Sequence, residues 1–379
     1  MEVDAEVLVE AAYCHFTKIL SSGILAPNRI MELLPVLEPE DKPKEGIWYA
    51  LVPRGGAPGV SVGHTCTYLP SSDGDKGRIV IIGGANPNGS FSDCHVIDLD
   101  RHEWEEPEWP GLLARYEHCA FVPESSPQSL WVFAGAEQSG NRNCVQTLDR
   151  TDGASWKSVQ VKGTPPSPRT YHTNTACVGE RLFVFSGGGA GAAPVTDLQL
   201  HVFDAVSMSW SQPAVHGKPP SSRHGHVVVA VGPKLYMHGG LVGDKFHSDM
   251  FCLDTTTMTW EQVRGKGDIP PGVAAHSALA VGKNIYIFGG MTAEGAVNSM
   301  YRYQTADRER WILVKFEGDQ PPNRLDHGMC LVPWHVRTES EEGSQSQGTK
   351  SGTVNLCFVF GGMDTQGVIH NDCVVTVLT

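Results

Sequence analysis

Short hydrophobic runs recur along the chain, and six of them end in a pair of small residues. Runs such as RIVIIGG, RLFVFSGG and NIYIFGG are rich in β-branched and aromatic residues, so they predict β-strands rather than helices. The pairs recur at intervals of about 50 residues, with a longer last interval, and such a period is typical of repeat architectures. They are Gly83-Gly84, Ala134-Gly135, Gly187-Gly188, Gly239-Gly240, Gly289-Gly290 and Gly361-Gly362.

Each repeat also has an element at its start that ends in histidine, and five repeats carry a tryptophan after the third expected strand. Two copies of the starting element, Ser61/His64 and Val273/His276, keep only the histidine of an Arg-x-x-His pattern. The complete copies are Arg115/His118, Arg169/His172, Arg223/His226 and Arg324/His327. The tryptophans are Trp104, Trp156, Trp210, Trp260 and Trp311.

Four short antiparallel strands per repeat would make a small twisted sheet. Such a sheet is not stable alone because both of its faces need covering, and stacking the sheets in a ring covers both. Glycine suits strand ends where sheets converge and a Cβ has no room. A tryptophan ring is large enough to fill the space between two neighbouring sheets. We therefore interpret the glycine pairs and the tryptophans as structural.

This combination of glycine pair, spaced tryptophan and period resembles the kelch repeat over roughly residues 45–379. The resemblance implies an all-β fold, a six-bladed kelch β-propeller. The last repeat reaches Thr379 with three strands and no tryptophan after the third, whereas IWYALVP, before the first repeat, contains Trp48. We therefore expect Trp48 to Val52 to supply the fourth strand of the last blade and to close the ring.

Two segments fall outside the repeat pattern. Residues 1–44 are expected to form an N-terminal extension, with apolar positions at helical spacing over 3–20 followed by a proline-rich linker. The helix would either pack on the ring or fray in solvent, or it would dock a partner. Residues 336–353 are polar and rich in glycine and serine, so they predict a disordered loop between the first and second strands of the last repeat.

Composition narrows the classes of partner. The 379 residues carry a net charge of −13, which argues against nucleic acid or anionic lipid as the primary partner. No apolar run is long enough to span a bilayer. We therefore expect a cytoplasmic protein without a membrane anchor of its own. The 10 cysteines form no Cys-x-x-Cys motif, so buried free thiols are expected rather than disulfides or a zinc site.

The sequence contains no convincing catalytic or cofactor motif. The repeat histidines occur once per blade, too far apart to share an ion, and the HGH segment at 224–226 lacks further ligands. The glycine-rich run at 187–192 precedes a strand rather than a helix, so it does not predict a dinucleotide site. We expect no cofactor, no metal and no catalytic residue, and a metal-dependent kelch enzyme is the least favoured alternative.

Variable loops on one face of a rigid ring are the candidate binding surface. We expect the loops after the glycine pairs and the proline-rich connectors between blades to emerge together on this face. The loops contribute as candidate partner-binding residues Asn86, Asn141, Arg142 and Lys245. The repeat arginines are expected near its rim: Arg115, Arg169, Arg223 and Arg324. These arginines either hydrogen-bond neighbouring loops or form a partial cationic collar that recognises acidic side chains.

Segments spread over the repeats closely resemble the stand-alone kelch-motif Rab effectors of late-endosome-to-Golgi transport. They include IIGGANPNGSFSD, QSGNRNC, RHGHVVVA and RLDHGMC. This resemblance implies a non-enzymatic scaffold that binds a GTP-loaded Rab GTPase and supports receptor recycling from endosomes to the trans-Golgi network. It also implies that the protein reaches endosomal and trans-Golgi membranes only indirectly, through this lipidated partner. The alternative within the same fold is an adaptor that binds an acidic peptide or a cytoskeletal partner.

Overall fold

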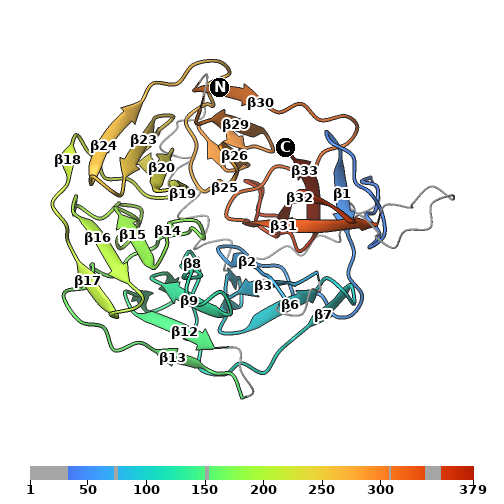
Figure 1. Cartoon of the computed structure of the whole chain (residues 1–379), viewed down its shortest axis with the longest axis horizontal. Coiled ribbons are helices and arrows are strands. Elements are labelled where there is room, and N and C mark those ends of the chain that lie inside the picture. The colour runs from blue at the N-terminus through green and yellow to red at the C-terminus, as the bar shows by residue number, and fades with distance from the viewer. Residues whose placement is uncertain (1–32, 72–75, 150–152, 307–308, 338–350) are drawn as a thin grey trace, which may run out of the picture.

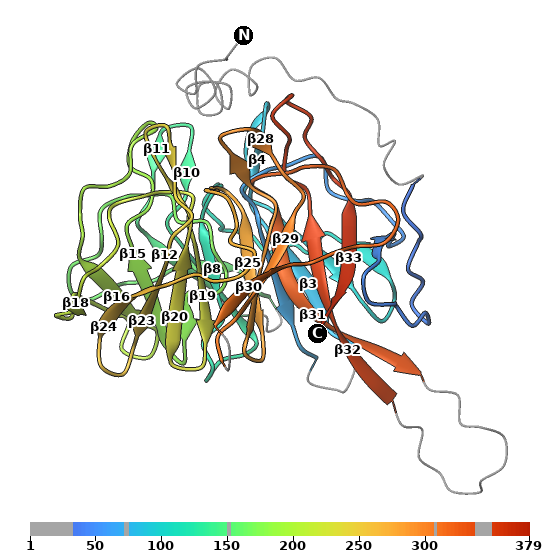
Figure 2. The same ribbon diagram turned by 90° about the horizontal axis from the view of Figure 1, so that it is seen from above.

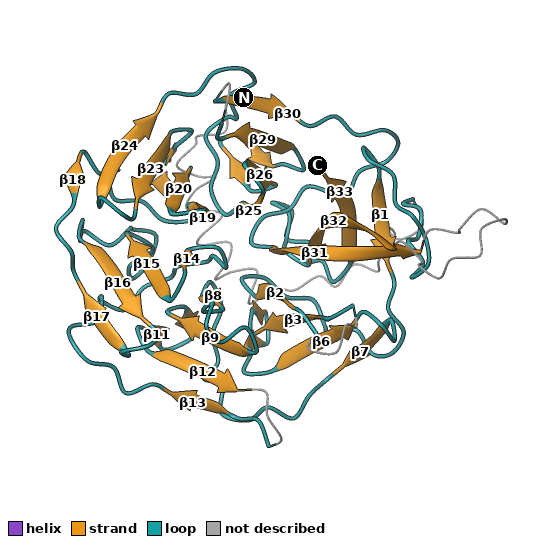
Figure 3. Ribbon diagram, in the orientation of Figure 1, coloured by secondary structure: helices purple, strands orange, loops and turns teal. Residues whose placement is uncertain are grey.

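Six small sheets surround a common axis (Figure 1). The computed structural model describes residues 33–71, 76–149, 153–306, 309–337 and 351–379. All regular secondary-structure elements in these residues are strands, as Figure 3 shows. Each sheet has four antiparallel main strands that run from the axis to the rim. The prediction of a six-bladed propeller is confirmed, whereas the helix expected over 3–20 lies outside the described residues.

The blades are numbered in chain order, and their strands are given from the axis outward. Blade 1 contains β2 (Thr65–Leu69), β3 (Arg78–Ile82), β6 (Cys94–Asp98) and β7 (Glu103–Glu105). Blade 2 contains β8 (Cys119–Phe121), β9 (Ser129–Phe133), β12 (Val145–Asp149) and β13 (Trp156–Ser158). Blade 3 contains β14 (Cys177–Val178), β15 (Arg181–Phe185), β16 (Leu200–Asp204) and β17 (Ser209–Ser211).

The remaining blades follow the same order. Blade 4 contains β19 (Val227–Val231), β20 (Lys234–His238), β23 (Met250–Asp254) and β24 (Thr259–Val263), with the short β18 (His216–Gly217) parallel to β24. Blade 5 contains β25 (Ser277–Val281), β26 (Asn284–Phe288), β29 (Met300–Gln304) and β30 (Arg310–Leu313). Blade 6 contains β31 (Gly328–Arg337), β32 (Ser351–Phe360), β33 (Cys373–Leu378) and β1 (Trp48–Leu51).

Blade 6 closes the ring with a strand from near the start of the chain. Strand β1 pairs antiparallel with β33, so that Trp48 lies opposite Thr376. The Thr376 hydroxyl donates a hydrogen bond to the Ile47 carbonyl at 2.8 Å. The preceding chain runs along the free edge of β1, where the Leu37 amide donates to the Ala50 carbonyl at 2.9 Å. This pairing confirms the predicted closure.

Glycine pairs and repeat histidines meet across the seams between blades. A Cβ on Gly361 would lie 2.7 Å from the ring of His64 in blade 1, and a Cβ on Gly289 would lie 2.7 Å from the ring of His327 in blade 6. Both glycines also have positive φ angles, +65° and +67°, which residues with a side chain rarely adopt. Glycine is therefore required both for the turn and for the close approach of the next blade.

Tryptophans fill the seams farther from the axis. The ring of Trp210 lies 4.9 Å from that of Phe133, at the end of the second strand of the preceding blade. Trp48 makes the equivalent contact with Phe288 at 5.0 Å. Because Trp48 is completely buried, the closing strand is packed as firmly at this seam as a strand within a continuous blade.

In blade 3 the turn begins one residue earlier than the glycine doublet in the sequence indicates. Ser186 and Gly187 have φ angles of 59° and 117°, matching the positive φ angles of the glycine pairs in other blades. The Gly187 amide donates to the Arg223 carbonyl, the same bond that the second glycine of a pair makes elsewhere. The hydroxyl of Ser186 also donates to Arg223 O, at 2.8 Å, and holds the serine in this backbone conformation. Assigning Gly187-Gly188 as the pair was therefore wrong by one residue.

The inner segment of blade 3 crosses the propeller axis. The Asn174 side-chain amide donates to the carbonyls of Cys66 in blade 1, at 2.6 Å, and of Met329 in blade 6, at 2.8 Å. The Nε2 atom of His172 lies 2.7 Å from the carbonyl of His64. A cavity of about 20 Å³ remains between these groups, so the axis is closed rather than open.

The two faces of the ring carry different structures (Figure 2). On one face lie four two-stranded hairpins: β4 (Ala85–Asn86) with β5 (Gly89–Ser90), β10 (Ala136–Glu137) with β11 (Gly140–Asn141), β21 (Leu241–Val242) with β22 (Lys245–Phe246), and β27 (Met291–Thr292) with β28 (Gly295–Ala296). The long hairpin of β31 and β32 projects from the other face.

Both ends of the segment expected to be a disordered loop, 336–353, are strand. Val336 pairs with Gly352, and Arg337 pairs with Ser351. The ladder that starts in the hydrophobic part of this hairpin continues in register into the polar part, because backbone pairing does not depend on apolar side chains. The loop prediction was therefore too long at both ends, and residues 338–350 lie outside the described residues.

Candidate functional site

The loops that follow the glycine pairs and the connectors between blades share one face, which we call the doublet face. Backbone hydrogen bonds join the two sets of loops. The Arg115 amide donates to the Phe91 carbonyl and the Arg324 amide to the Val297 carbonyl, both at 3.1 Å. Four of the loops are themselves paired hairpins. Their exposed tips are therefore presented on well-supported backbone.

The repeat arginines are buried rather than presented on this face. Their exposed fractions are 0% to 1%, and one guanidinium nitrogen of each donates to a carbonyl at the end of the second strand. The donor and acceptor pairs are Arg115 with Ala134, Arg169 with Ser186, Arg223 with Gly239, and Arg324 with Gly361. Of the two alternatives for these arginines, hydrogen bonding to neighbouring loops is the one observed, because the buried guanidinium groups satisfy strand-end carbonyls and loop side chains and offer no surface for a cationic collar.

Carboxylates in the following loop neutralise three of these arginines. Asp372 binds Arg324 through two hydrogen bonds of 2.9 Å, and both side chains have no exposed surface. Asp249 binds Arg223 in the same way in blade 4, but it remains 28% exposed. In blade 2 the oxygen of Gln146 accepts from Arg115 at 2.7 Å. These pairs stabilise the turns of the blades that carry a repeat arginine.

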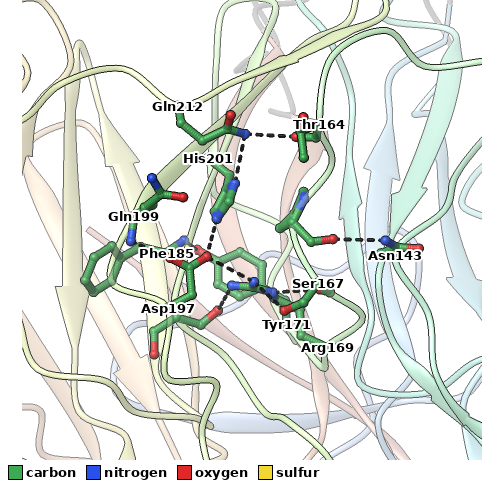
Figure 4. Close-up of polar contacts among 12 residues, drawn as sticks. Asn143, Thr164, Ser167, Arg169, Tyr171, Phe185, Asp197, Gln199, His201 and Gln212 are labelled. Atoms are coloured by element: carbon green, nitrogen blue, oxygen red, sulfur yellow. Dashed lines mark hydrogen bonds and ion pairs between the residues drawn. The ribbon is translucent and has the colours of Figure 1, made fainter.

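In blade 3 the arginine belongs to a wider polar network (Figure 4). Asp197 lies 3.6 Å from Arg169 and also bonds Nε2 of His201. Burial acts to raise the pKa of Asp197, but the bonds from His201 and the Gln199 amide lower it overall. Gln212 lies 3.1 Å from Nδ1 of His201 and donates to the Thr164 carbonyl at 2.9 Å. The network thus attaches the proline-rich connector to the blade.

The four candidate residues of the loops occupy different settings. Asn141 donates to the Gly189 carbonyl at 2.9 Å, which links the loops of blades 2 and 3. Arg142 pairs with Glu137 at 3.1 Å within its own hairpin, and Asn86 donates to a carbonyl in blade 1. Lys245 is exposed on β22. The structure places Asn141 and Arg142 on adjacent positions of one loop, whereas Lys245 is two blades away.

A ring of residues that sequence reasoning missed surrounds the axis on the doublet face. Each is the residue before a repeat histidine, and we call the set the axial ring: Gly63, Glu117, Tyr171, Gly225, Ala275 and Asp326. Five backbone hydrogen bonds of 2.7–2.9 Å link its members: Tyr171 to Glu117, Glu117 to Gly63, Gly63 to Asp326, Asp326 to Ala275, and Ala275 to Gly225. The sequence signal that could have revealed this ring is the presence of an acid before the repeat histidine in two repeats, where the other four repeats have an uncharged residue.

The two acids of the axial ring lie on either side of Gly63, and Glu117 shifts the pKa of Asp326. Burial raises the pKa of Glu117 to about 7, although the Thr170 hydroxyl opposes this shift by donating to its carboxylate. Burial and the neighbouring Glu117 raise the pKa of Asp326 well above its usual range. The pKa of Tyr116 rises to about 12, through burial and then through both acids. Like charges in a desolvated position are typical of functional sites.

The described part of the chain contains no group of three or more His, Cys, Asp or Glu side chains placed to hold a metal ion. His224 and His226 of the HGH segment are each 6% exposed, and burial lowers the pKa of His226 to about 3. The nine described cysteines are free thiols. Within the described residues, no helix has the length and apolar character needed to cross a bilayer.

Comparison with known proteins gives two results. A family model described as the KLHDC2/KLHL20/DRC7 Kelch-repeats domain matches residues 63–290. Proteins called "Rab9 effector protein with kelch motifs" are similar over most of their length. The Danio rerio protein is 63% identical over 92% of this chain and 100% of its own length. The Mus musculus protein is 54% identical over 92% of this chain and 98% of its own length. The Homo sapiens protein is 50% identical over 92% of this chain and 100% of its own length.

Proposed function

Because the chain belongs to the kelch-repeat family of Rab9 effector proteins with kelch motifs, we propose that it is a protein-binding scaffold whose doublet face binds GTP-loaded Rab9. The observation that carries the assignment to this face is its supported set of loops. Four hairpins and the connectors are fixed by backbone hydrogen bonds, so little conformational entropy is lost on binding.

A preformed face suits recognition of a GTPase. The γ-phosphate of GTP orders the switch segments of such a protein, and these segments collapse after hydrolysis. A rigid surface of about 800 Å² per partner is enough for a specific complex and needs no cofactor. The propeller would therefore distinguish the two nucleotide states by the shape of the switch segments.

The cellular role follows from the partner. A Rab GTPase carries lipid anchors, so the scaffold would reach endosomal and trans-Golgi membranes indirectly, from the cytoplasm. Its net charge of −13 is consistent with recruitment by a protein rather than by anionic lipid. In this role it supports vesicle transport and receptor recycling from late endosomes to the trans-Golgi network.

Binding to Rab9 loaded with a non-hydrolysable GTP analogue or with GDP tests the proposal. We expect the purified chain to bind the GTP form at least about tenfold more tightly, a difference of about 1.4 kcal/mol, measured by isothermal titration calorimetry. Equal binding of both forms would favour an adaptor that does not read the nucleotide state.

A pair of matched variants assigns the face. Lys245 and Lys234 are both exposed residues of blade 4, but Lys245 lies on a doublet-face hairpin and Lys234 begins β20 at the opposite end of the sheet. Lys245→Trp should weaken binding at least about tenfold, or about 1.4 kcal/mol. Lys234→Trp should leave binding within about twofold. The reverse order of effects would move the interface to the other face.

A further inference from the structure

The axial ring presents two carboxylates on either side of a single glycine. The Glu117 amide donates to the Gly63 carbonyl at 2.7 Å, and the Gly63 amide donates to the Asp326 carbonyl at 2.9 Å. Both acids therefore have fixed backbone positions at the end of the axis that opens on the doublet face. Neutral residues make up the rest of the ring: Gly63, Tyr171, Gly225 and Ala275.

Neither carboxylate has a cationic partner among the described residues. Asp326 is only 8% exposed, yet no hydrogen bond or ion pair from this part of the chain reaches its carboxylate. Glu117 is partly exposed and accepts a bond from the Thr170 hydroxyl. Asp372 is a useful contrast, since it is also buried, at 2% exposed, but binds Arg324 through two hydrogen bonds. A buried acid without a donor is costly, and it indicates a group that receives its partner from outside.

The closed axis limits what can occupy this position. Below the ring, the Asn174 side chain bonds two other blades and leaves a cavity of about 20 Å³. An occupant must therefore enter from the doublet face and end at the ring. A lysine side chain fits these conditions, because it is an unbranched chain that ends in a compact ammonium group with three donors.

We propose that Glu117 and Asp326 together receive one lysine side chain of the protein that docks on the doublet face. This inference rests on the proposed function and specifies the chemistry that the GTPase presents at the centre of the interface. Here the ammonium donates hydrogen bonds to both carboxylates and replaces the mutual repulsion of the acids with attraction. Such a buried charge pair contributes to specificity, because a partner without the lysine leaves both acids unpaired.

A small amine tests the site without the GTPase. n-Butylammonium reproduces the lysine side chain, and thermal unfolding is measured in its chloride salt and in sodium chloride at equal concentration. For each chain we take the melting temperature in n-butylammonium chloride minus that in sodium chloride. This difference should be at least about one degree larger for the wild-type chain than for the Glu117→Gln/Asp326→Asn variant. An equal response of the two chains overturns the proposal, and it is also the result expected if the acids only share a proton.

The second test measures binding of GTP-loaded Rab9. The Glu117→Gln/Asp326→Asn variant should bind at least tenfold more weakly. Glu124→Gln/Asp149→Asn makes the same change of charge at exposed positions of blade 2 on the opposite face, and it should stay within about twofold. Folding of the first variant is checked by its melting temperature, which should not fall because the substitution removes buried repulsion. If the wild-type chain binds GTP-loaded Rab9 and the Glu117→Gln/Asp326→Asn variant binds it equally well, the lysine site is overturned but the proposed function is not. Absence of wild-type binding overturns the proposed function, and the amine experiment then decides the site.

Discussion

Blade 4 and blade 6 have the same four-stranded order but obtain their outer strands differently. In blade 4 a short turn connects β23 to β24, and the Asp254 carboxylate stabilises it by accepting the amides of Thr256 and Thr257 at 2.9 and 3.2 Å. In blade 6 the partners β33 and β1 come from the two ends of the described chain. One blade is therefore closed by a local turn and the other only by side-chain and backbone contacts.

The difference shows how non-local closure is stabilised. The entropy cost of joining distant segments grows only slowly with their separation, so a moderate number of contacts offsets it. Blade 6 supplies these contacts through Trp48 and Leu37, which are fully buried, and Leu34, which is 5% exposed. The Thr376 hydroxyl adds a bond to Ile47. Closure thus depends on residues from 34 onward, a longer segment than β1 alone.

The largest expected effect comes from removing the closing strand. A chain that begins at residue 55 lacks β1 and its tryptophan, and it should lose more than about 5 kcal/mol of unfolding free energy, or about 10 °C in melting temperature. A chain that begins at residue 42 keeps β1 but loses Leu34 and Leu37, so it should melt between the first variant and a chain that begins at residue 33. Differential scanning calorimetry gives the three values, and equal melting of the chains starting at 42 and 55 contradicts closure by β1.

A smaller effect should distinguish the internal ion pairs of the two blades. Asp372→Asn leaves Arg324 buried without a negatively charged partner, and it should cost about 3 kcal/mol. Asp249→Asn in blade 4 is the matched control. Its carboxylate is 28% exposed and water can solvate the arginine there, so about 1 kcal/mol is expected. Urea denaturation measures both, and a larger loss in blade 4 would contradict the interpretation of blade 6 as the more demanding seam.

The smallest effect concerns pH at the seam between blades 6 and 1. Burial, aided by His172, lowers the pKa of His64 to about 3 from an unfolded value of 6.5. The stability gained from its neutral form is therefore complete above pH 6.5 and declines as the pH falls toward 3. Between pH 6.5 and 5 the loss is about 2 kcal/mol for this histidine.

Replacing the histidine checks this sign. His64→Gln should reduce the slope of unfolding free energy against pH by about one proton in this interval, and His226→Gln should do the same at the seam between blades 3 and 4, since burial lowers that pKa to about 3 as well. Urea denaturation at several pH values gives the slopes. If the slope of unfolding free energy against pH were unchanged in both variants, burial would not keep these histidines neutral.

The sequence predicted the architecture because its signals are local and repeated. Glycine pairs and tryptophans recur in each unit, and each repeat needs neighbours to cover its sheet. The closing strand was predictable because the last repeat lacks the tryptophan that follows the third strand in other repeats, and Trp48 supplies it. In blade 3 the glycine doublet lies one residue after the turn, so the turn was assigned to the wrong pair. Ser186 takes the place of the first glycine, and its hydroxyl donates a hydrogen bond to the Arg223 carbonyl.

The candidate site was less predictable because its geometry is set by distant residues. The direction of three of the four repeat arginines depends on an acid in a later loop, as with Arg324 and Asp372, 48 positions apart. The pairing of Glu117 with Asp326 depends on the closure of the whole ring, which brings blades 2 and 6 to either side of Gly63. Neither relation has a local pattern that a single sequence displays.

The bonds from Asn174 of blade 3 to blades 1 and 6 close the middle of the ring. Molecules bound on its two sides cannot exchange through the middle, so each side is an independent platform. Anchoring the protein to a sensor chip through the projecting β31–β32 hairpin would orient every copy with its other side toward the solution (Figure 2).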